Sequence, residues 1–583
     1  MVIAESFDRS MSYRAELVGP TRIAFLATSK VPANKGMGRA LGIETLGGFL
    51  QKNFGDTVAM QFIDLQYEGD ADSAVDALIA DPTIDILGIS VRYATYGQME
   101  QILARLSAFP RIQREKRPFV VVGGVMPSFT ALEIVGRFPF ASVVKGEGEL
   151  AMLELTRTIR SGGSLHEVSG LTFFDEGSGA IISNPPRNVP LPEISSGTII
   201  PDLIPKLVER RGIVWVSGSR GCPWDCNFCS VSAFREMTGA NGKARREMRP
   251  VEDIIGELRA LYNLGARAFV FADDEMLVGT PKDLKRWHAL AEGVKTIGDD
   301  ISLECSVRSD VIWNKDDKDG GHARREAFHA LVDAGLSHVY IGFESGSPTQ
   351  LRRYNKGEDV ETHFRAIEIL REEGVLVGGG FIMFDPLMNL KEIEENIAFL
   401  RKAELISHNR RDYVGDIFDM LRVQRGARYL DMLSERGLLG DPIPQTLFYT
   451  YRFEDSNIQH IAETCIGLAA EVDDFFEALK TSILSSAMVD DAQGIESPGA
   501  KLLQYYITEL RLLDLSLLED LVNATKEKSD ATFEDLVGAY RRNRRELLAT
   551  LKSELQSSEM TDRDSVQVLI SLIDRVPDFQ EPI

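Results

Sequence analysis

The sequence predicts an α/β protein with two parallel-sheet domains and a helical C-terminal domain. From Thr21 to Arg160, apolar runs of strand length alternate with amphipathic segments, which is typical of a parallel α/β sheet. A second series of this kind begins at Gly212, and from about Asp455 onward apolar residues stand at helical spacing with few glycines. We therefore expect an N-terminal extension (1–20), a first α/β domain (21–163), a linker (164–210), a second α/β domain (211–440) and a helical domain (441–583).

Composition favours a soluble protein of ordinary globular type. A chain of 583 residues is too long for one core, so we expect three or four domains, and 44% hydrophobic with 26% charged residues is a usual globular balance. The first residues contain no apolar run of signal-peptide length, and nowhere do about 18 apolar residues follow one another, so we expect a cytoplasmic protein without a membrane partner. The formal charge of −23 argues against a nucleic-acid partner, although a local basic patch stays open.

Five strand–helix units build the first α/β domain. Their number and order predict a flavodoxin-like, doubly wound (Rossmann-type) sheet, in which ligands bind at the carboxyl ends of the strands. The expected strands are Arg22–Thr28, Val58–Leu65, Ile84–Val91, Phe119–Gly123 and Ala141–Lys145, and the expected helices are Met37–Lys52, Asp72–Ile79, Gly97–Ser107, Phe129–Arg137 and Glu149–Arg160. The linker breaks this periodicity with glycines and prolines, and we expect one hairpin in it, from Leu171–Phe174 and Ala180–Ser183.

The strand ends of this domain carry the candidate ligand contacts. Glycines there let the backbone approach a bulky ligand, and hydroxyl and carboxylate side chains can hydrogen-bond it. These signals alone favour a nucleotide as much as any other ligand. The candidate residues are Ser90, Tyr93, Thr95, Gly123, Gly124, Pro127, Ser128, Gly146, Glu147 and Gly148.

The segment SRGCPWDCNFCS places Cys222, Cys226 and Cys229 in a C-x3-C-x2-C spacing. Three thiolates on one loop can hold three corners of an iron–sulfur cluster and leave one iron open. A structural zinc site needs four ligands, and no second cysteine pair is present, since Cys305 and Cys465 stand alone. Disulfides are less expected still, because five cysteines in so long a chain suit a reducing compartment.

This cysteine spacing, with Phe228 before its last cysteine, resembles the signature of radical S-adenosylmethionine (SAM) enzymes. The resemblance implies a four-iron four-sulfur (4Fe–4S) cluster whose open iron chelates the amino and carboxylate groups of SAM. It also implies that the second domain is a partial (β/α)6 barrel with chemistry at its carboxyl ends. Its strands are expected at Ile213–Ser217, Ala268–Ala272, Ser302–Val307, His338–Phe343, Val377–Met383 and Val414–Arg422, with helices such as Val251–Leu264 and Ala323–Ala334 between them.

Three strand ends of this barrel carry candidate SAM contacts. Asp273 and Asp274 could bind the SAM ammonium or line the substrate pocket, and the alternative is a pair of solvated loop acids. Arg308 is placed to bind the SAM carboxylate in a bidentate manner. In the family, the glutamate of the E-S-G-S segment approaches the SAM ribose and amino group, which implies Glu344 here, whereas Lys356 is expected at the surface.

The segments VVGG-x2-PS and KGEGE, placed before such a cysteine loop, resemble the cobalamin-binding domain of cobalamin-dependent radical SAM enzymes. The resemblance covers roughly residues 21–160. The D-x-H-x2-G loop of many cobalamin domains is missing, because residues 27–38 read ATSKVPANKGMG and no histidine precedes His166. If cobalamin binds, its tail must be tucked away with no histidine beneath the cobalt.

These resemblances predict a methyltransferase that uses a 4Fe–4S cluster, SAM and cobalamin. We expect it to methylate a small molecule in natural-product biosynthesis, such as antibiotic biosynthesis, with electrons from an external flavodoxin- or ferredoxin-type donor. The alternative is a cyclase or rearrangement enzyme that uses the same cofactors without methyl transfer. A tRNA methylthiotransferase would carry further N-terminal cysteines, and none precedes Cys222. A sensor with a structural cluster is a further alternative. No residue is assigned a catalytic role beyond cofactor binding.

Overall fold

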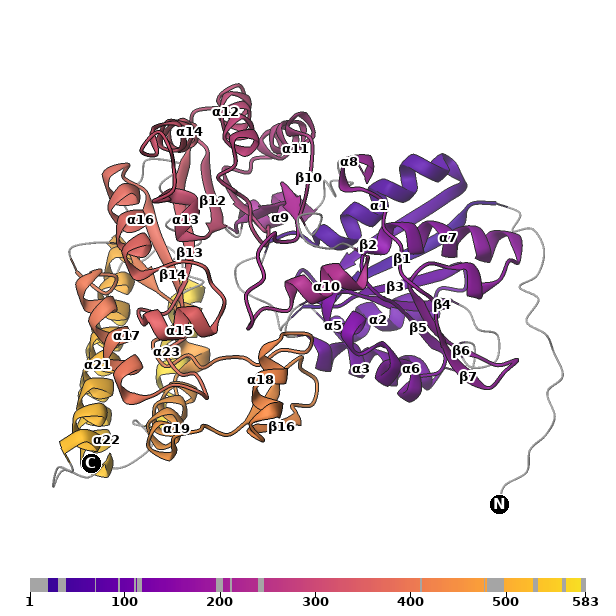
Figure 1. Cartoon of the computed structure of the whole chain (residues 1–583). Coiled ribbons are helices and arrows are strands. Elements are labelled where there is room, and N and C mark those ends of the chain that lie inside the picture. The colour runs from indigo at the N-terminus through magenta and orange to yellow at the C-terminus, as the bar shows by residue number, and fades with distance from the viewer. Residues whose placement is uncertain are drawn as a thin grey trace, which may run out of the picture.

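The computed structural model divides the chain into two α/β domains and a helical C-terminal part. It describes residues 19–29, 38–68, 70–92, 95–109, 112, 118–194, 203–209, 212–239, 246–408, 411–476, 478–479, 498–527, 533–557 and 563–577. The two α/β domains lie side by side, and the C-terminal helices pack on the side of the second domain that faces away from the first (Figure 1). Among these described residues, no helix is both long enough and apolar enough to cross a membrane.

The N-terminal domain is built on a seven-stranded sheet of order β2-β1-β3-β4-β5-β6-β7. The first five strands are parallel and have the predicted flavodoxin-like order. The hairpin β6–β7 extends the sheet antiparallel to β5. The strands are β1 (Thr21–Ala27), β2 (Val58–Asp64), β3 (Ile86–Ser90), β4 (Phe119–Gly123), β5 (Ala141–Val144), β6 (Leu171–Asp175) and β7 (Ala180–Ser183).

Helices cover both faces of this sheet, so its central strands are buried on both sides and consist of nearly continuous apolar runs. Helix α2 begins where Asp70 accepts a hydrogen bond from the backbone N–H of Asp72, and α7 ends at Gly162, which has a φ of +68°. The helices of this part are α1 (Leu41–Phe54), α2 (Ala71–Ala80), α3 (Tyr96–Ser107), α5 (Val125–Phe129), α6 (Ala131–Arg137), α7 (Gly148–Ser161), α8 (Leu191–Ile194) and α9 (Leu203–Glu209).

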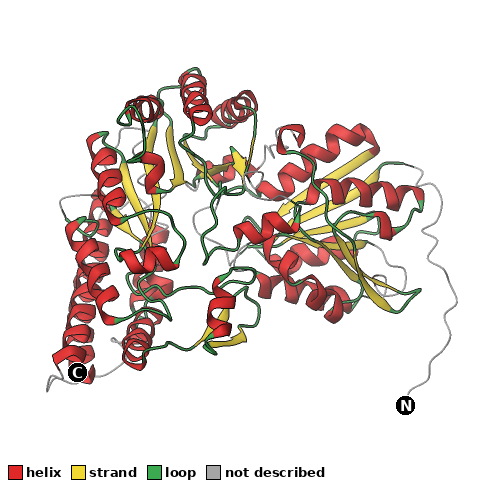
Figure 2. Ribbon diagram, in the orientation of Figure 1, coloured by secondary structure: helices red, strands yellow, loops and turns green. Residues whose placement is uncertain are grey.

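The second domain, from β8 through α18, is called the barrel domain below. Its parallel six-stranded sheet has the order β15-β14-β13-β12-β11-β8, so β15 and β8 form its edges. Helices lie along the outer side of its strands (Figure 2). This is the predicted partial (β/α)6 barrel. The strands are β8 (Val214–Val216), β11 (Ala268–Phe271), β12 (Ser302–Val307), β13 (Leu336–Glu344), β14 (Leu376–Phe381) and β15 (Tyr413–Val414), and a short antiparallel pair joins β9 (Ser219–Arg220) to β10 (Glu247–Met248).

The outward faces of the barrel strands and the surrounding helices share the largest core of the molecule. Helix α12 begins with Thr280 as N-cap followed by Pro281, and α17 begins with a capping box of Asn389 and Glu392, so sequence signals fix both starts. The helices of the domain are α10 (Val231–Met237), α11 (Val251–Asn263), α12 (Pro281–Lys295), α13 (Ser309–Ile312), α14 (His322–Asp333), α15 (Pro348–Arg353), α16 (Val360–Glu372), α17 (Leu390–Lys402) and α18 (Tyr429–Glu435).

The C-terminal part is mostly helical, as expected, but starts with a hairpin. Strands β16 (Leu439–Pro442) and β17 (Tyr449–Tyr451) pair antiparallel across the predicted boundary at 440/441. The helices that follow are α19 (Ser456–Ala470), α21 (Pro498–Glu527), α22 (Phe533–Ser557) and α23 (Arg563–Ile573). The first half of α21, with Leu503, Tyr506 and Leu510, forms a separate core with α22 and α23. The apolar stripes of α19 and of the second half of α21 pack instead into the core of the barrel domain. These stripes therefore have a packing role.

Three elements differ from the sequence-based expectation. The hairpin expected within a linker is part of the N-terminal sheet. The single helix expected at 129–137 is divided at Thr130, which follows α5 and precedes α6. The sixth barrel strand, expected over 414–422, is limited to two residues of β15, and beyond it only an isolated bridge between Phe384 and Met420 continues the pairing.

Candidate functional site

The cysteine loop lies between β9 and α10, at the carboxyl end of the first barrel strand. Cys222, Cys226 and Cys229 are all half-buried. The backbone N–H of Cys229 donates to the carbonyl oxygen of Cys226 at 3.1 Å, which closes a turn between the last two cysteines. Among the described residues, no three His, Cys, Asp or Glu side chains surround a single metal ion. In a cluster, each thiolate binds a different iron, so the thiols need not converge on one point.

Backbone contacts fix the loop to the segment after β13. The backbone N–H of Asn227 donates to the carbonyl oxygen of Tyr354 at 2.8 Å, and its side-chain amide donates to that of Arg353 at 2.9 Å. Phe228 packs edge-on against the buried ring of Tyr354, with 5.1 Å between the ring centroids. Phe228 was predicted as a cofactor contact. In the structure, its ring packs on Tyr354 and so anchors the cysteine loop to the segment after β13.

Burial and nearby cations act in opposite directions on the thiols. Burial raises the pKa of Cys222 and of Cys229 to about 12. Burial also raises the pKa of Cys226, although the positive charges of Lys356 and Arg308 counteract it. A metal-coordinating thiol loses its proton outright, so these donors fit a cluster whose iron supplies the missing positive charge.

Arg308 follows β12 and faces the cysteine loop. Its guanidinium lies over the Trp224 ring, 4.2 Å from the ring centroid, and its Nη1 is 3.9 Å from Cys226 Sγ. The Nε and Nη2 atoms both donate to the Asp310 carboxylate at 3.0 Å. Arg308 was expected to bind the SAM carboxylate in a bidentate manner. In the structure, this bidentate contact is made to Asp310, and only Nη1 is directed at the cysteine loop.

Glu344 ends β13 in an unusual backbone conformation. Its φ is +64°, a region that costs a non-glycine residue of the order of 1–3 kcal/mol and is concentrated at functional sites. Its carboxylate folds back over Gly342, because a Cβ added at Gly342 would lie 2.4 Å from Glu344 Oε1. Lys356 Nζ is 3.5 Å from the same oxygen, and Lys356 is 5% exposed, so its expected surface position was wrong.

Asp273 and Asp274 hold the backbone that leads into the cysteine loop. The Asp273 carboxylate accepts from the backbone N–H of Gly218 at 2.9 Å and from the Ser219 hydroxyl, while Asp274 Oδ2 accepts from the backbone N–H of Gly221 at 3.0 Å. Burial raises the pKa of Asp273 to about 6. Asp273 is buried rather than a solvated loop acid.

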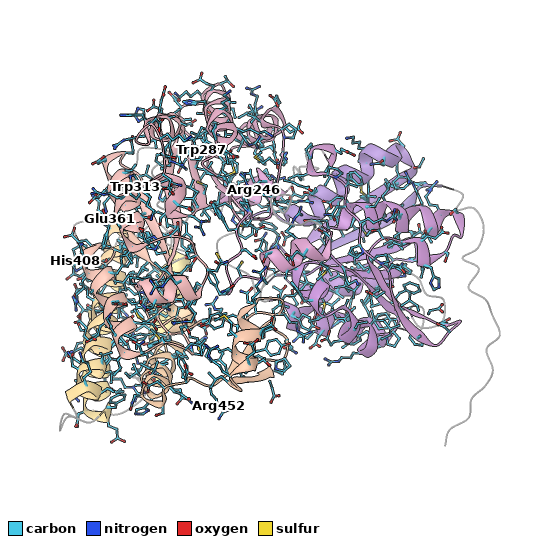
Figure 3. The ribbon with its side chains drawn as sticks, in the orientation of Figure 1. Arg246, Trp287, Trp313, Glu361, His408 and Arg452 are labelled. Atoms are coloured by element: carbon cyan, nitrogen blue, oxygen red, sulfur yellow. The ribbon has the colours of Figure 1, made fainter. Side chains whose placement is uncertain are left out.

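Arg246 completes this support, near the boundary between the two α/β domains (Figure 3). It donates to the carbonyl oxygens of Glu275 and Met276 at 3.0 and 2.6 Å, and its guanidinium also pairs with Asp283 at 3.1 Å. The strand end after β11 is therefore held in place from two sides.

A cavity of about 440 Å³ lies where the N-terminal sheet meets the barrel domain. This volume suits a drug-sized ligand, or one part of a larger one. A Cβ added at Gly123 would meet no atom within 4 Å, so this glycine leaves open space. Of the predicted contacts, the cavity is lined by Ser90, Gly123, Gly124, Gly146, Glu147, Gly148 and Asp274.

Three further predicted contacts of the N-terminal domain, Thr95, Pro127 and Ser128, lie at the same sheet edge but do not line the cavity. The Thr95 hydroxyl donates to the Arg92 carbonyl oxygen at 2.7 Å. Ser128 Oγ accepts from the backbone N–H of Gly146 at 3.0 Å and donates to the Gly124 carbonyl oxygen at 2.8 Å, so it joins the two glycine segments, while Pro127 is buried in α5. Tyr93 and residues 30–37 of the histidine-free loop lie outside the described residues.

Ion pairs between the two α/β domains form part of the site that the sequence did not reveal. Arg220, two residues before Cys222, pairs with Glu147 at 3.0 Å and with Glu149 at 2.6 Å. Arg235 in α10, after the last cysteine, pairs with Glu147 at 2.7 Å. The KGEGE and SRGCP segments were both recognised, but no local pattern connects residues 71 positions apart.

A second group of ion pairs also borders the cavity. Arg39, before α1, pairs with Glu257 of α11 at 2.5 Å and with Glu44 of α1. Arg249 reaches Glu257 from the barrel side at 2.6 Å and also donates to the Ser217 carbonyl oxygen at 2.7 Å. Both domains therefore contribute charges to one buried cluster.

The barrel interior contains a carboxyl group that the sequence analysis also missed. Glu304 in β12 is 8% exposed, and its Oε2 has no hydrogen-bond partner among the described residues. Burial raises the pKa of Glu304 to about 7. Its strand neighbour across the sheet is His338 of β13, and its charge acts on the buried hydroxyl of Tyr413 in β15. The alternation of side chains along β12 could have predicted that Glu304 lies inside the barrel. It could not have predicted that Glu304 Oε2 lacks a hydrogen-bond partner among the described residues.

Comparison with known proteins agrees with this architecture. Residues 216–400 match the family model of the radical SAM superfamily. The chain is 27% identical to 4'-phospho-dehydrooxetanocin synthase of Priestia megaterium over 63% of this chain and 49% of that protein. It is 31% identical to the uncharacterized methyltransferase PH0819 of Pyrococcus horikoshii over 49% of this chain and 58% of that protein. The chain thus spans about half the length of the curated relatives it matches.

Among solved structures, the fold is similar to that of the cobalamin-dependent SAM radical enzyme OxsB with aqua-cobalamin bound. The TM-score is 0.77 at 21% identity, and the match covers 96% of this chain and 84% of that chain. The radical SAM domain implies a 4Fe–4S cluster and SAM, for which the three half-buried thiols supply a fitting donor set. This chain therefore contains a radical SAM domain within the fold of a cobalamin-dependent radical SAM enzyme.

Proposed function

We propose that this protein is a cobalamin-dependent radical SAM methyltransferase that acts on a small molecule in natural-product biosynthesis. The observation that carries the proposal is the cavity at the carboxyl ends of the N-terminal strands. The same cavity is lined by Ser219, Arg220 and Gly221, which lead directly into the cysteine loop. A ligand there and a cluster on the loop would lie close enough to serve one substrate.

The residues at the cavity fit part of a cobalamin. The strand-end glycines leave room for a bulky group. The first histidine of the chain, His166, lies between α7 and β6 near Asp175, and none of the described residues that line the cavity is a histidine that could bind cobalt. A cavity of about 440 Å³ would take one part of so large a cofactor, such as its nucleotide tail. The remainder would lie at the boundary between the domains.

When bound, the cluster and SAM supply a radical initiator, and cobalamin supplies a methyl carrier. The roles of the chain's own residues follow from their positions. Cys222, Cys226 and Cys229 hold the cluster, and Glu344, supported by Lys356, is placed to accept hydrogen bonds from SAM. Arg308 Nη1 provides a donor beside the cluster, and Asp273 and Asp274 keep the backbone of the loop in place. Electrons would come from an external flavodoxin- or ferredoxin-type donor.

A second candidate function is a cyclization or rearrangement with the same cofactors and without methyl transfer. The observation that favours it is the name of one relative, since the protein from Priestia megaterium is a synthase and not a methyltransferase. The methyltransferase is preferred because the relative from Pyrococcus horikoshii has the higher sequence identity and is named a methyltransferase.

The test uses SAM that carries a labelled methyl group. The reconstituted protein, supplied with hydroxocobalamin and a reductant, is incubated with candidate small molecules, and the products are analysed by mass spectrometry. Label in the product supports methyl transfer. A product without label, accompanied by 5'-deoxyadenosine, would instead establish the rearrangement, and absence of both a labelled product and reductant-dependent 5'-deoxyadenosine would exclude both candidates. The variant Glu154→Gln serves as a control, because Glu154 on α7 pairs with Arg187, between β7 and α8, and neither residue lines the cavity.

A further inference from the structure

Two carboxylates that follow β5 hold the two arginines on either side of the cysteine loop. Glu147 bridges Arg220 and Arg235, with its two oxygens 3.0 and 2.7 Å from the guanidinium nitrogens. Glu149 Oε1 accepts a second hydrogen bond from Arg220 at 2.6 Å. Arg220 precedes the first cysteine by two residues, and Arg235 lies in the helix that follows the last one. The N-terminal domain thus forms ion pairs with residues on both sides of the cysteine loop.

The same side chains line the cavity. Glu147, Glu149, Arg220 and Arg235 all border it, together with the neighbouring Gly146 and Gly148. Whatever fills the cavity therefore touches the groups that position the loop. The pairs Glu149–Arg220 and Glu147–Arg235 each have one buried partner, since the side chains of Glu149 and Arg235 are 4% and 2% exposed, whereas those of Arg220 and Glu147 are 22% and 18% exposed.

Glu149 has one carboxylate oxygen left over. Its Oε2 is buried and has no hydrogen-bond partner among the described residues. Buried polar atoms in native proteins are nearly always paired, and a buried charged oxygen without a donor is costly. A ligand with N–H or O–H groups that entered the cavity would supply the missing donor.

We propose that Glu149 couples the two cofactor sites: Oε1 holds Arg220 at the start of the cysteine loop, and Oε2 accepts a hydrogen bond from the ligand in the cavity. This inference rests on the proposed function, in which the ligand is cobalamin, whose side chains carry primary amide donors. Filling the cavity fixes the Glu149 carboxylate and, through Arg220, stabilises the conformation of the loop that binds the cluster. By thermodynamic reciprocity, a bound cluster tightens cobalamin binding by the same factor.

The experiment measures this coupling as a ratio of dissociation constants. Hydroxocobalamin is titrated under anaerobic conditions into the full-length protein with and without its reconstituted cluster, and binding is followed by equilibrium dialysis. For the wild-type protein we expect at least about 5-fold tighter binding when the cluster is present. Conversely, hydroxocobalamin should slow the loss of the cluster to a chelator, measured by its visible absorbance.

The variant Glu149→Gln separates coupling from support of the fold. Glutamine can still accept a hydrogen bond from Arg220 through its carbonyl oxygen, but it replaces the other acceptor by an NH2 donor. We expect the ratio of dissociation constants to fall to about 1, within a factor of about 2. Glu154→Gln is the matched control, because Glu154 lies on the same helix and pairs with Arg187 at 2.7 Å, outside the cavity. Its ratio should equal that of the wild type.

Arg220→Lys provides a second measurement if Glu149→Gln does not fold. Lysine keeps the charge but cannot hold both carboxylates through a planar fork, so the ratio should again fall while Glu154→Gln retains it. Equal hydroxocobalamin affinities of the wild-type protein with and without cluster would overturn the coupling and leave the proposed function intact. A ratio in Glu149→Gln as large as in the wild type would also overturn it. No binding of hydroxocobalamin to either wild-type form would overturn the proposed function together with this inference.

Discussion

Replacing Glu304 by glutamine should make the barrel domain more stable at neutral pH and above. Glu304 is a buried carboxyl group inside the barrel, and its Oε2 lacks a hydrogen-bond partner among the described residues. Burial raises the pKa of Glu304, because the fold disfavours the charged carboxylate relative to the neutral acid. Glutamine has nearly the same shape and is neutral at every pH, so it removes this cost.

The size and direction of the effect follow from the pKa of the group. Burial raises the pKa of Glu304 from its ordinary 4.5 to about 7. Between these values the folded protein binds more protons than the unfolded chain, so its stability falls as the pH rises. At about 1.4 kcal/mol for each pH unit, the wild-type protein loses about 3 kcal/mol across this window, and the loss is complete above about pH 7. Glu304→Gln should therefore match the wild type near about pH 4.5 and exceed its stability by about 3 kcal/mol at about pH 8.

Tryptophan fluorescence can follow this domain separately. All four tryptophans of the chain lie in the barrel domain, and two of them, Trp287 and Trp313, are labelled in Figure 3. Urea unfolding of the wild type and of Glu304→Gln is compared at several pH values, with the exposed Glu326→Gln on α14 as control. A stability difference between Glu304→Gln and wild type that does not change with pH would refute the reasoning.

Three substitutions test the site itself. Gly123→Leu should keep the melting temperature within about 2 °C, because a Cβ there meets no atom within 4 Å, yet weaken hydroxocobalamin binding at least about tenfold in equilibrium dialysis. Gly342→Ala should weaken SAM binding about tenfold in calorimetric titration, because the added Cβ would clash with Glu344 Oε1 and push the Glu344 carboxylate out of its position. Cys229→Ala should remove the visible absorbance of the cluster and the dithionite-dependent release of 5'-deoxyadenosine, while the circular dichroism spectrum stays unchanged.

Each of these substitutions has an outcome that contradicts its premise. Unchanged hydroxocobalamin affinity in Gly123→Leu would show that the ligand does not occupy the cavity. SAM affinity equal to that of the wild type in Gly342→Ala would remove Glu344 from the SAM site. A full cluster in Cys229→Ala would mean that other groups hold the iron.

The strands and their order could be predicted because each parallel unit has its own local pattern. β13 was expected at His338–Phe343 and extends two residues further at its start and one at its end, to Leu336–Glu344. The hairpin β6–β7 was also expected, but its attachment to β5 was not, because sequence periodicity does not say which sheet edge a strand meets. The split between α5 and α6 at Thr130 was missed for a related reason, since apolar spacing continues through the break.

The candidate site was predictable at the level of segments and not at the level of contacts. Glycine segments after β4 and β5 do line the cavity, and Glu344 does end its strand beside Lys356. The pairing of Glu149 with Arg220 could not be predicted from the sequence, because it depends on how the two α/β domains pack against each other. Arg308 illustrates the same limit. It was expected to bind the SAM carboxylate, but its bidentate partner in the structure is Asp310, two residues further along the chain.

The ion pairs between the α/β domains determine how the chain would behave if it were divided. A chain cut between α8 and α9 would leave Arg220, Arg235 and Arg249 on one polypeptide. Two carboxylates that hold the first two of these arginines, Glu147 and Glu149, would remain on the other. The two pieces would then recognise each other through complementary charge, so that their association would weaken as ionic strength rises. The salt concentration would therefore control how much of the divided protein is assembled.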